Sequence, residues 1–140
     1  AMNKNDISVE DLQARISNFI EKAKVSSDVE FHFEVAKNIV KETNFTSMQG
    51  MNMYRIIQEA VNNSLKYAEA TLIKVAINKS EAAFVEVSIF DNGKGLSKGF
   101  NFEDDGSLGM QLIYLLSEQI DAKTKMINEQ GLGYEIIGEI

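Results

Sequence analysis

The chain has 140 residues, enough for one domain and too few for a multi-domain enzyme, and its 44% hydrophobic and 25% charged content is typical of a globular protein. A net charge of −7 argues against a nucleic-acid partner, and no apolar run approaches the roughly 20 residues that cross a bilayer. The chain has no cysteine and one histidine, so it lacks a disulfide, a thiol nucleophile and a histidine cluster for zinc.

The beginning of the chain shows no recognisable leader. Residues 1–7 are predicted to be disordered, and Ala1-Met2 is typical of a cloning remnant, so we expect a piece of a longer protein. Ser8 opens a pattern that resembles a capping box, and apolar residues at helical spacing then predict a helix over residues 8–25.

Alternation and helical period predict the later elements. Residues 29–35 alternate apolar and polar side chains, which predicts a strand with one exposed face, whereas residues 36–45 show no clear period. The remaining elements are a helix at 47–68, strands near 71–79 and 83–91, a polar glycine-rich loop at 92–106, a helix at 107–120, and strands near 122–128 and 134–140 joined as a hairpin by residues 129–133. Because the strands are partly consecutive and the helices are separated, the predicted fold class is α+β.

The predicted helix at 47–68 carries polar residues opposite an apolar stripe. A helical projection places Glu59, Asn62, Asn63 and Lys66 on that polar side. A solvated face is the plain explanation, but adjacent asparagines in mid-helix disfavour the helix because their amides compete for the backbone. Glu59 and Asn63 lie one turn apart, so their oxygens can share a polarised water or a Mg²⁺ ion. The apolar stripe consists of Ile57, Val61, Ser64, Leu65 and Ala68.

Glycines gather in one part of the chain. Five of the nine lie between Gly93 and Gly109, and the spacing matches no Walker loop. Asn92-Gly93 is also typical of a hairpin turn, but the residues that follow do not alternate as a returning strand would. Gly106-Ser107-Leu108-Gly109 opens a predicted helix, and the free N–H groups of a helix N-terminus attract phosphate. Together with the Glu/Asn helix, these glycines predict a nucleotide pocket with a mobile lid.

Three segments together resemble a known family. They are residues 58–68, the pattern Asp91-x-Gly93-x-Gly95, and the pattern Gly106-x-Leu108-Gly109-Met110. In this order they are similar to the motifs of the ATP-binding catalytic domain of sensor histidine kinases, whose superfamily includes gyrase, Hsp90 and MutL. The resemblance covers residues 12–140. It implies one domain over residues 1–140, cut from a longer sensor kinase, with a two-layer α/β sandwich in which a mixed, mostly antiparallel sheet carries three helices on one face.

The resemblance also implies roles for single residues. Asn63 matches the residue that holds Mg²⁺ against the ATP phosphates, and Glu59 matches an acidic catalytic residue that activates water in the ATPases of the superfamily. Asp91 matches the carboxylate that accepts a hydrogen bond from the adenine amino group. The other ATP-binding positions are Lys66 and Tyr67 near phosphate or ribose, Gly93 and Gly95 close to the base, Gly106 and Gly109 as hinges of the lid, and Leu108 between them.

Two residues depart from the family pattern, and the single histidine does not match a phosphoacceptor. Ser107 stands where the family usually has another glycine, and Tyr134 stands where it often has a threonine that touches the adenine. His32 is the only histidine, but family phosphoacceptors lie on a helix of a separate dimerisation domain. Because His32 lies on the polar side of a predicted strand, we interpret it as a surface residue.

The resemblance implies that the chain binds ATP and Mg²⁺ and donates the γ-phosphoryl group to a histidine in two-component signalling. The implied partners are the dimerisation/histidine-phosphotransfer domain of the same parent protein and, downstream, a response regulator. The implied location is cytoplasmic, without direct membrane contact by this domain, whether or not the parent is membrane-anchored. Two alternatives stay open: a stand-alone serine kinase of the anti-sigma-factor type, and a non-catalytic ATP-binding interaction module. The sequence of residues 54–68 favours the sensor kinase over these two alternatives.

Overall fold

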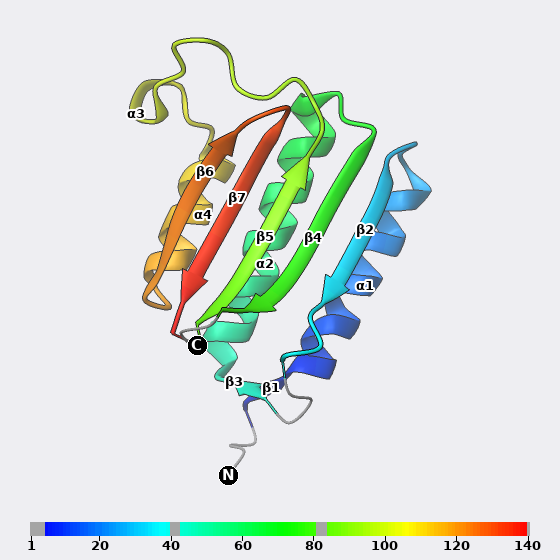
Figure 1. Cartoon of the computed structure of the whole chain (residues 1–140), viewed down its shortest axis with the longest axis vertical. Coiled ribbons are helices and arrows are strands. Elements are labelled where there is room, and N and C mark those ends of the chain that lie inside the picture. Colours follow the sequence, from blue (N-terminus) through cyan, green and yellow to red (C-terminus); the bar gives the residue numbers. More distant parts are fainter. Residues whose placement is uncertain (1–4, 40–42, 81–83, 140) are drawn as a thin grey trace.

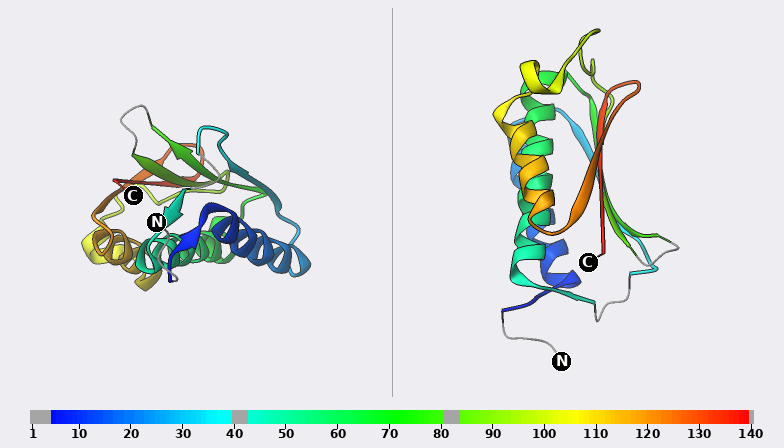
Figure 2. Two further views of the ribbon diagram at one scale, coloured as in Figure 1. Left: turned by 90° about the horizontal axis from the view of Figure 1, so that it is seen from below. Right: turned by 90° about the vertical axis from the view of Figure 1, so that its left-hand side faces the viewer.

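The computed structural model describes residues 5–39, 43–80 and 84–139, and it has two layers. Three long helices, α1, α2 and α4, cover one face of a five-stranded sheet, and the other face of the sheet is open (Figures 1 and 2). The elements are β1 (Ile7–Ser8), α1 (Val9–Val25), β2 (Glu30–Val35), β3 (Asn44–Phe45), α2 (Ser47–Asn63), a π-helical turn η1 (Ser64–Ala68), β4 (Leu72–Lys79), β5 (Val85–Asp91), α3 (Phe102–Asp105), α4 (Leu108–Glu118), β6 (Ala122–Asn128) and β7 (Leu132–Gly138).

The order of the strands in the large sheet is β2-β4-β5-β7-β6. The β2–β4 pair is parallel, whereas the β4–β5, β5–β7 and β6–β7 pairs are antiparallel. The predicted α+β class and the predicted sandwich, with a mixed, mostly antiparallel sheet and three helices on one face, are therefore confirmed. Within the described ranges, no helix is long and apolar enough to cross a membrane.

The core lies between the sheet and the helices, and strand periodicity explains it. In β5, every second residue is buried, from Val85 through Val87 and Ile89 to Asp91. The alternation points these side chains toward the helices, because successive residues of a strand face opposite sides of the sheet. The last of them is a carboxylate, so β5 delivers Asp91 to the helix side of the sheet at the end of the strand.

Helix α2 begins at a complete capping box. The Thr46 side chain accepts a hydrogen bond from the Gln49 amide, and the Gln49 side chain accepts one from the Thr46 amide. The helix was predicted to run to residue 68, and helical backbone does reach Ala68. Its last turn from Ser64 is π-helical, and Glu69 ends it with a left-handed φ of 55°. A π turn changes which side chains face the sheet, and such turns are frequent at functional sites.

Several local features differ from the predictions. Ile7 was placed in a disordered start at residues 1–7, but it forms β1 with Ser8, pairs antiparallel with β3 and is buried. Residues 1–4 lie outside the described residues. The unpatterned segment 36–45 contains β3, the loop at 92–106 contains α3, and the last strand begins at Leu132 instead of 134. The predicted start of the strand at 83–91 and the predicted end of the strand at 134–140 lie outside the described residues.

Candidate functional site

Asp91 is the centre of a hydrogen-bonded cluster at the end of β5. Its Oδ2 accepts a hydrogen bond of 2.5 Å from the Ser64 hydroxyl, and its Oδ1 accepts one of 2.9 Å from the Gly93 amide and one of 3.2 Å from the Leu132 amide. The side chain is 8% exposed. A buried carboxylate is stable only when donors surround it, and three elements provide them here: η1, the loop after β5 and the start of β7.

Two glycines let the backbone close around Asp91. A Cβ at Gly93 would collide with the carbonyl oxygen of Ala68, and a Cβ at Gly131 would collide with the carbonyl oxygen of Asp91. The amide of Lys94 donates to the same Ala68 carbonyl at 2.8 Å. The loop after β5 is therefore fastened to the end of the π turn, and this brings Asp91 next to the helix residues Asn63 and Ser64.

Glu59 and Asn63 lie together at the N-terminus of α4. An ideal Cβ at Gly109 would lie 3.0 Å from Asn63 Nδ2, 3.1 Å from Asn63 Oδ1 and 3.1 Å from Glu59 Oε2. Ser107 caps this helix by accepting a hydrogen bond of 3.1 Å from the Met110 amide. The preceding amides, of Leu108 and Gly109, are the first two of the helix and have no intrahelical acceptor. A carboxylate, a carboxamide and helix amides thus meet at one place.

The side chains of Glu59 and Asn63 at the N-terminus of α4 fit a Mg²⁺ ion that also binds phosphate. No group of three histidine, cysteine or acidic side chains that could hold a metal occurs among the residues that the structure describes. Glu59 and Asn63 supply one carboxylate and one amide oxygen, which suits an ion that keeps several waters and takes other ligands from phosphates. Asn63 Nδ2 is buried without a hydrogen-bond partner, so this side chain has unused hydrogen-bonding capacity.

Tyr134 is 2% exposed and lies on the helix side of β7, where it pairs with Ile89 of β5. Its hydroxyl is also a buried atom without a hydrogen-bond partner. Burial raises the pKa of the Tyr134 phenol, the charges of Tyr114 and Asp91 add to the rise, and the Asn63 side chain opposes it. The phenol therefore stays protonated and neutral at physiological pH.

A small cavity opens between α2, η1 and the loop after β5. Its volume is about 60 Å³, whereas pockets that bind small molecules have roughly 300–1,000 Å³. With the segment 95–106 in its present position, the cavity is too small for a nucleotide. In its present position the Phe102 ring of α3 packs on Tyr114 of α4, with 4.7 Å between ring centroids. The cavity is lined by Asn63, Ser64, Tyr67, Ala68, Asp91, Gly95, Leu96, Met110 and Leu132.

The structure brings together most of the predicted site residues. Asn63, Tyr67, Asp91 and Gly95 line the cavity, and Glu59 and Gly109 lie beside Asn63. Gly95 needs its glycine because its φ is +69°.

The remaining predicted positions lie outside the cavity lining. Lys66 is exposed, and Leu108 is 82% exposed. The close approach at Gly93 is to Ala68 of the π turn, and Gly106 ends α3, where its amide donates to the Phe102 carbonyl at 2.9 Å. These two glycines shape the loop and the lid helix by packing against protein backbone.

The sequence analysis missed several contacts of this site. Ser64 was assigned to the apolar stripe, yet its hydroxyl donates a hydrogen bond to Asp91. Asn128, in β6, accepts a hydrogen bond of 2.9 Å from the Leu96 amide and so ties the lid to the last hairpin. Leu132 and Met110 complete the cavity wall. Met110 belongs to the third motif of the resemblance but was given no role there. Ser64, Asn128 and Leu132 have no local sequence signal, because each acts through a contact between distant parts of the chain.

Charged side chains around the cavity are unevenly placed. Lys66, Lys94 and Lys98 are exposed, and none belongs to an ion pair among the described residues. Three consecutive acidic residues, 103–105, lie on α3 in the lid. The lysines make the local potential less negative than the net charge implies, and the acidic residues of α3 partly oppose them.

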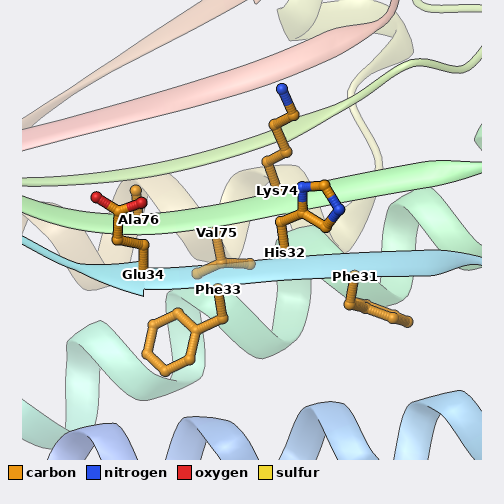
Figure 3. A pocket seen from close by; sticks show the side chains of 7 residues that line it. All are labelled: Phe31, His32, Phe33, Glu34, Lys74, Val75 and Ala76. Carbon is orange, nitrogen blue, oxygen red and sulfur yellow. The ribbon is translucent and has the colours of Figure 1, made fainter.

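His32 lies on β2, at the edge of the sheet and separated from β5 by β4. Figure 3 shows His32, Glu34 and Lys74 on one side of the strands, and Phe31 and Phe33 on the opposite side, toward the helices. His32 Nε2 lies 3.4 Å from Glu30 Oε2. It therefore lies on the open face of the sheet, whereas Asp91 and Asn63 lie between the sheet and the helices.

This architecture, with a carboxylate at a strand end and a Glu/Asn pair facing a glycine-bounded lid, defines an ATPase-like domain. The family model described as "Histidine kinase-, DNA gyrase B-, and HSP90-like ATPase" matches residues 48–139. The match extends over more than half of the chain, and the chain belongs to this family.

Among curated relatives, the signal transduction histidine-protein kinase/phosphatase DegS of Brevibacillus brevis is 31% identical over 93 residues, which are 64% of this chain and 23% of DegS. The chain thus spans about a quarter of that relative's length. The blue-light activated histidine kinase of Erythrobacter litoralis EL346 has the same fold, with a TM-score of 0.75 and 14% identity over 94% of this chain and 45% of that one. The ATP-binding domain of PrrB from Mycobacterium tuberculosis has a TM-score of 0.66 and 20% identity over 94% of this chain and 93% of that one.

Proposed function

We propose that the chain binds Mg·ATP and donates the γ-phosphoryl group to a histidine on a separate dimerisation domain of a longer sensor kinase. The observation that carries the proposal is the meeting of Asp91, Asn63 and the N-terminus of α4 around one cavity. A response regulator then takes the phosphoryl group from that histidine. The proposed location is cytoplasmic, with Mg²⁺ as the metal and Asn63 as its ligand.

Asp91 is the proposed adenine-binding residue. Its two oxygens already accept three hydrogen bonds, and an ionised carboxylate has about four lone-pair sites. One acceptor site therefore remains for the exocyclic amine of adenine. Because Ser64, Gly93 and Leu132 fix the carboxylate, its direction is set before the base arrives, and this lowers the ordering cost of binding.

The phosphate chain is proposed to extend from Asp91 past Asn63 to the first turn of α4. There the Leu108 and Gly109 amides act as donors, and Lys66, Lys94 and Lys98 add positive charge at longer range. The Asn63 carboxamide oxygen, with the Glu59 carboxylate beside it, would hold a Mg²⁺ ion, which would neutralise charge on the phosphate oxygens. Such a domain works by positioning and by charge stabilisation, since phosphoryl transfer requires little covalent chemistry from the protein.

Glu59 is the proposed catalytic residue of this chain. Its Oε2 faces Gly109 beside Asn63, so its carboxylate lies where the phosphate end of the nucleotide is proposed to bind. There it accepts the proton that the attacking imidazole loses, directly or through a water. The imidazole itself comes from the partner domain, because His32 lies on the open face of the sheet.

Incubation with γ-labelled ATP tests this function. The chain alone should bind ATP and carry no label, whereas addition of the dimerisation domain of the parent protein should give label on that domain. A phosphohistidine is recognised because it is labile in acid and stable in base. Glu59→Gln should slow the labelling and keep nucleotide binding, and Asp104→Asn, in the lid helix, serves as its control.

Three other outcomes would contradict the proposal. Stable label on His32 would make the chain its own acceptor. Acid-stable label on a serine of an added partner would favour the serine kinase of the anti-sigma-factor type. Binding of ATP without any transfer to the dimerisation domain would favour a non-catalytic interaction module.

A further inference from the structure

Asn128, at the end of β6, holds the first residues of the lid segment 95–106. Its Oδ1 accepts a hydrogen bond of 2.9 Å from the Leu96 amide, and its Nδ2 donates one of 3.4 Å to the Leu96 carbonyl. A Cβ at Gly95 would collide with the same Oδ1, so this two-bond contact requires a glycine there. One side chain therefore fixes both backbone groups of a residue 32 positions away in the chain.

The residue on the other side of Gly95 is held as well. The Lys94 amide donates a hydrogen bond of 2.8 Å to the Ala68 carbonyl at the end of η1. The start of the lid segment is thus tied to the π turn through Lys94 and to the last hairpin through Leu96. These ties bear on the cavity, because Leu96 lines it together with Asp91.

Beyond Leu96 the segment is held differently. Among the described residues, the hydrogen bonds of residues 97–105 stay within the lid segment itself. Residues 97–99 are exposed, and the contact with α4 is the packing of the Phe102 ring on Tyr114. This part of the lid can therefore move without breaking a hydrogen bond to the rest of the protein, whereas Leu96 cannot.

We propose that Asn128 is a positioning residue for nucleotide binding: it keeps Leu96 in place as a fixed wall of the cavity beside Asp91, so that the lid opens beyond Leu96. The inference rests on the proposed function, in which Asp91 binds adenine. Because the cavity of about 60 Å³ is smaller than a nucleotide needs, binding requires a rearrangement around it. The hydrogen bonds assign that rearrangement to residues 97–106. A wall that is ordered before the base arrives lowers the ordering cost of binding.

A carboxamide suits this task because it carries an acceptor and a donor on one planar group. Asn128 therefore meets the N–H and the C=O of Leu96 together, as a residue of a neighbouring strand would. Asn101, just before α3, makes a bond of the same kind inside the moving part, where its Oδ1 accepts from the Glu103 amide at 2.9 Å. Variants of the two asparagines can therefore separate the fixed wall from the moving part.

Limited digestion of the nucleotide-free chain with trypsin tests this division, because Lys94 and Lys98 lie on the two sides of Leu96 and both are exposed. In the parent, cleavage after Lys98 should be faster than cleavage after Lys94, with the fragments identified by mass. In Asn128→Ala, cleavage after Lys94 should accelerate by at least about fivefold, the factor that two ordinary hydrogen bonds contribute. Asn101→Ala is the matched control and should leave that rate unchanged.

Calorimetric titration with ADP tests the role in binding. Asn128→Ala should weaken ADP binding by about fivefold, since the wall must then be ordered during binding. The loss should be the same with Mg²⁺ and with EDTA, because Leu96 borders the residue that is proposed to bind adenine. Asn128→Asp keeps the acceptor for the Leu96 amide, so it should retain the ADP affinity of the parent and the protection of Lys94.

Several results would overturn the inference. In the parent, cleavage after Lys94 as fast as after Lys98 would show that the start of the lid is not fixed. Unchanged cleavage after Lys94 in Asn128→Ala, faster cleavage there in Asn101→Ala, or an Asn128→Asp variant that behaves like Asn128→Ala would each refute the assigned contact. A purely structural role predicts a lower unfolding temperature for Asn128→Ala with unchanged ADP affinity. A parent that binds no ADP, but shows the expected cleavage, would refute the proposed function and with it the role in binding.

Discussion

Ser64 Oγ donates a hydrogen bond of 2.5 Å to Asp91 Oδ2, and both residues are buried between the helices and the sheet. This bond joins the π turn after α2 to the end of β5, which are 27 residues apart in the chain. It therefore fixes the Asp91 carboxylate relative to Asn63, which directly precedes Ser64 in the chain. The geometry of the site depends on this connection more than on either segment alone.

Asp91→Asn should reduce the preference for ATP over GTP. At the position of the exocyclic amine of adenine, guanine carries a carbonyl, which the introduced carboxamide can bind and the native carboxylate repels. A hydrogen bond to a charged group contributes about 1.5–3 kcal/mol, so the ratio of the two dissociation constants should shift by about tenfold or more. Calorimetric titration with both nucleotides measures it. Equal loss for ATP and GTP would show that Asp91 only holds the loop after β5 in place.

Gly109→Ala should weaken binding without unfolding the protein. The added methyl group would lie 3.0–3.1 Å from Asn63 and Glu59, whose side chains can turn aside only by leaving the proposed metal position. Gly99→Ala is the matched control, since its Cβ would meet nothing within 4 Å but its φ is +81°. That control should lose about 1–2 kcal/mol of stability from backbone strain and keep its Mg·ATP affinity. If both variants lose affinity equally, Gly109 has no special place in the site.

Glu86→Gln should change the pH dependence of stability. Desolvation, together with a hydrogen bond to Glu135 and repulsion from its charge, raises the pKa of Glu86 above its usual 4.5. Because its pKa is raised on folding, Glu86 makes its full contribution to stability below about pH 4.5, and that contribution is lost as the pH rises through the folded-state pKa. The unfolding temperature of Glu86→Gln should therefore rise relative to the parent over that window. Unfolding temperatures of Glu86→Gln that follow those of the parent at every pH would contradict this prediction.

The sequence predicted the elements whose pattern is long and regular. Alternation located β4 and β5 to within about two residues at their described ends, and helical spacing located α1 and α4 equally well. Strands β1 and β3 have two residues each, too few for any period to be visible. The π turn was invisible for a different reason: Ser64–Ala68 continues the composition of a helix, and only the tertiary contact with Gly93 and Lys94 distinguishes it.

The site was predictable where chemistry depends on spacing along one element. Glu59 and Asn63 are one helical turn apart, so the sequence alone placed them together. Gly93 was predicted to approach a base, but its closest neighbour is Ala68, because the loop folds back on the π turn. The hydrogen bond from the Leu132 amide to Asp91 joins residues 41 positions apart, and a single sequence carries no signal for such a contact.

The central claim is that Asn63 holds Mg²⁺ against a bound nucleotide, and a calorimetric titration of Mg·ATP into the parent and into Asn63→Ala tests it most directly. The neighbouring Asn62→Ala is the control, since it removes the same side chain one position earlier on α2. We predict that the parent and Asn62→Ala bind Mg·ATP, that Asn63→Ala loses the Mg²⁺-dependent part of the affinity, and that all three unfold at similar temperatures. Binding of Mg·ATP to Asn63→Ala as tight as to the parent would contradict the account.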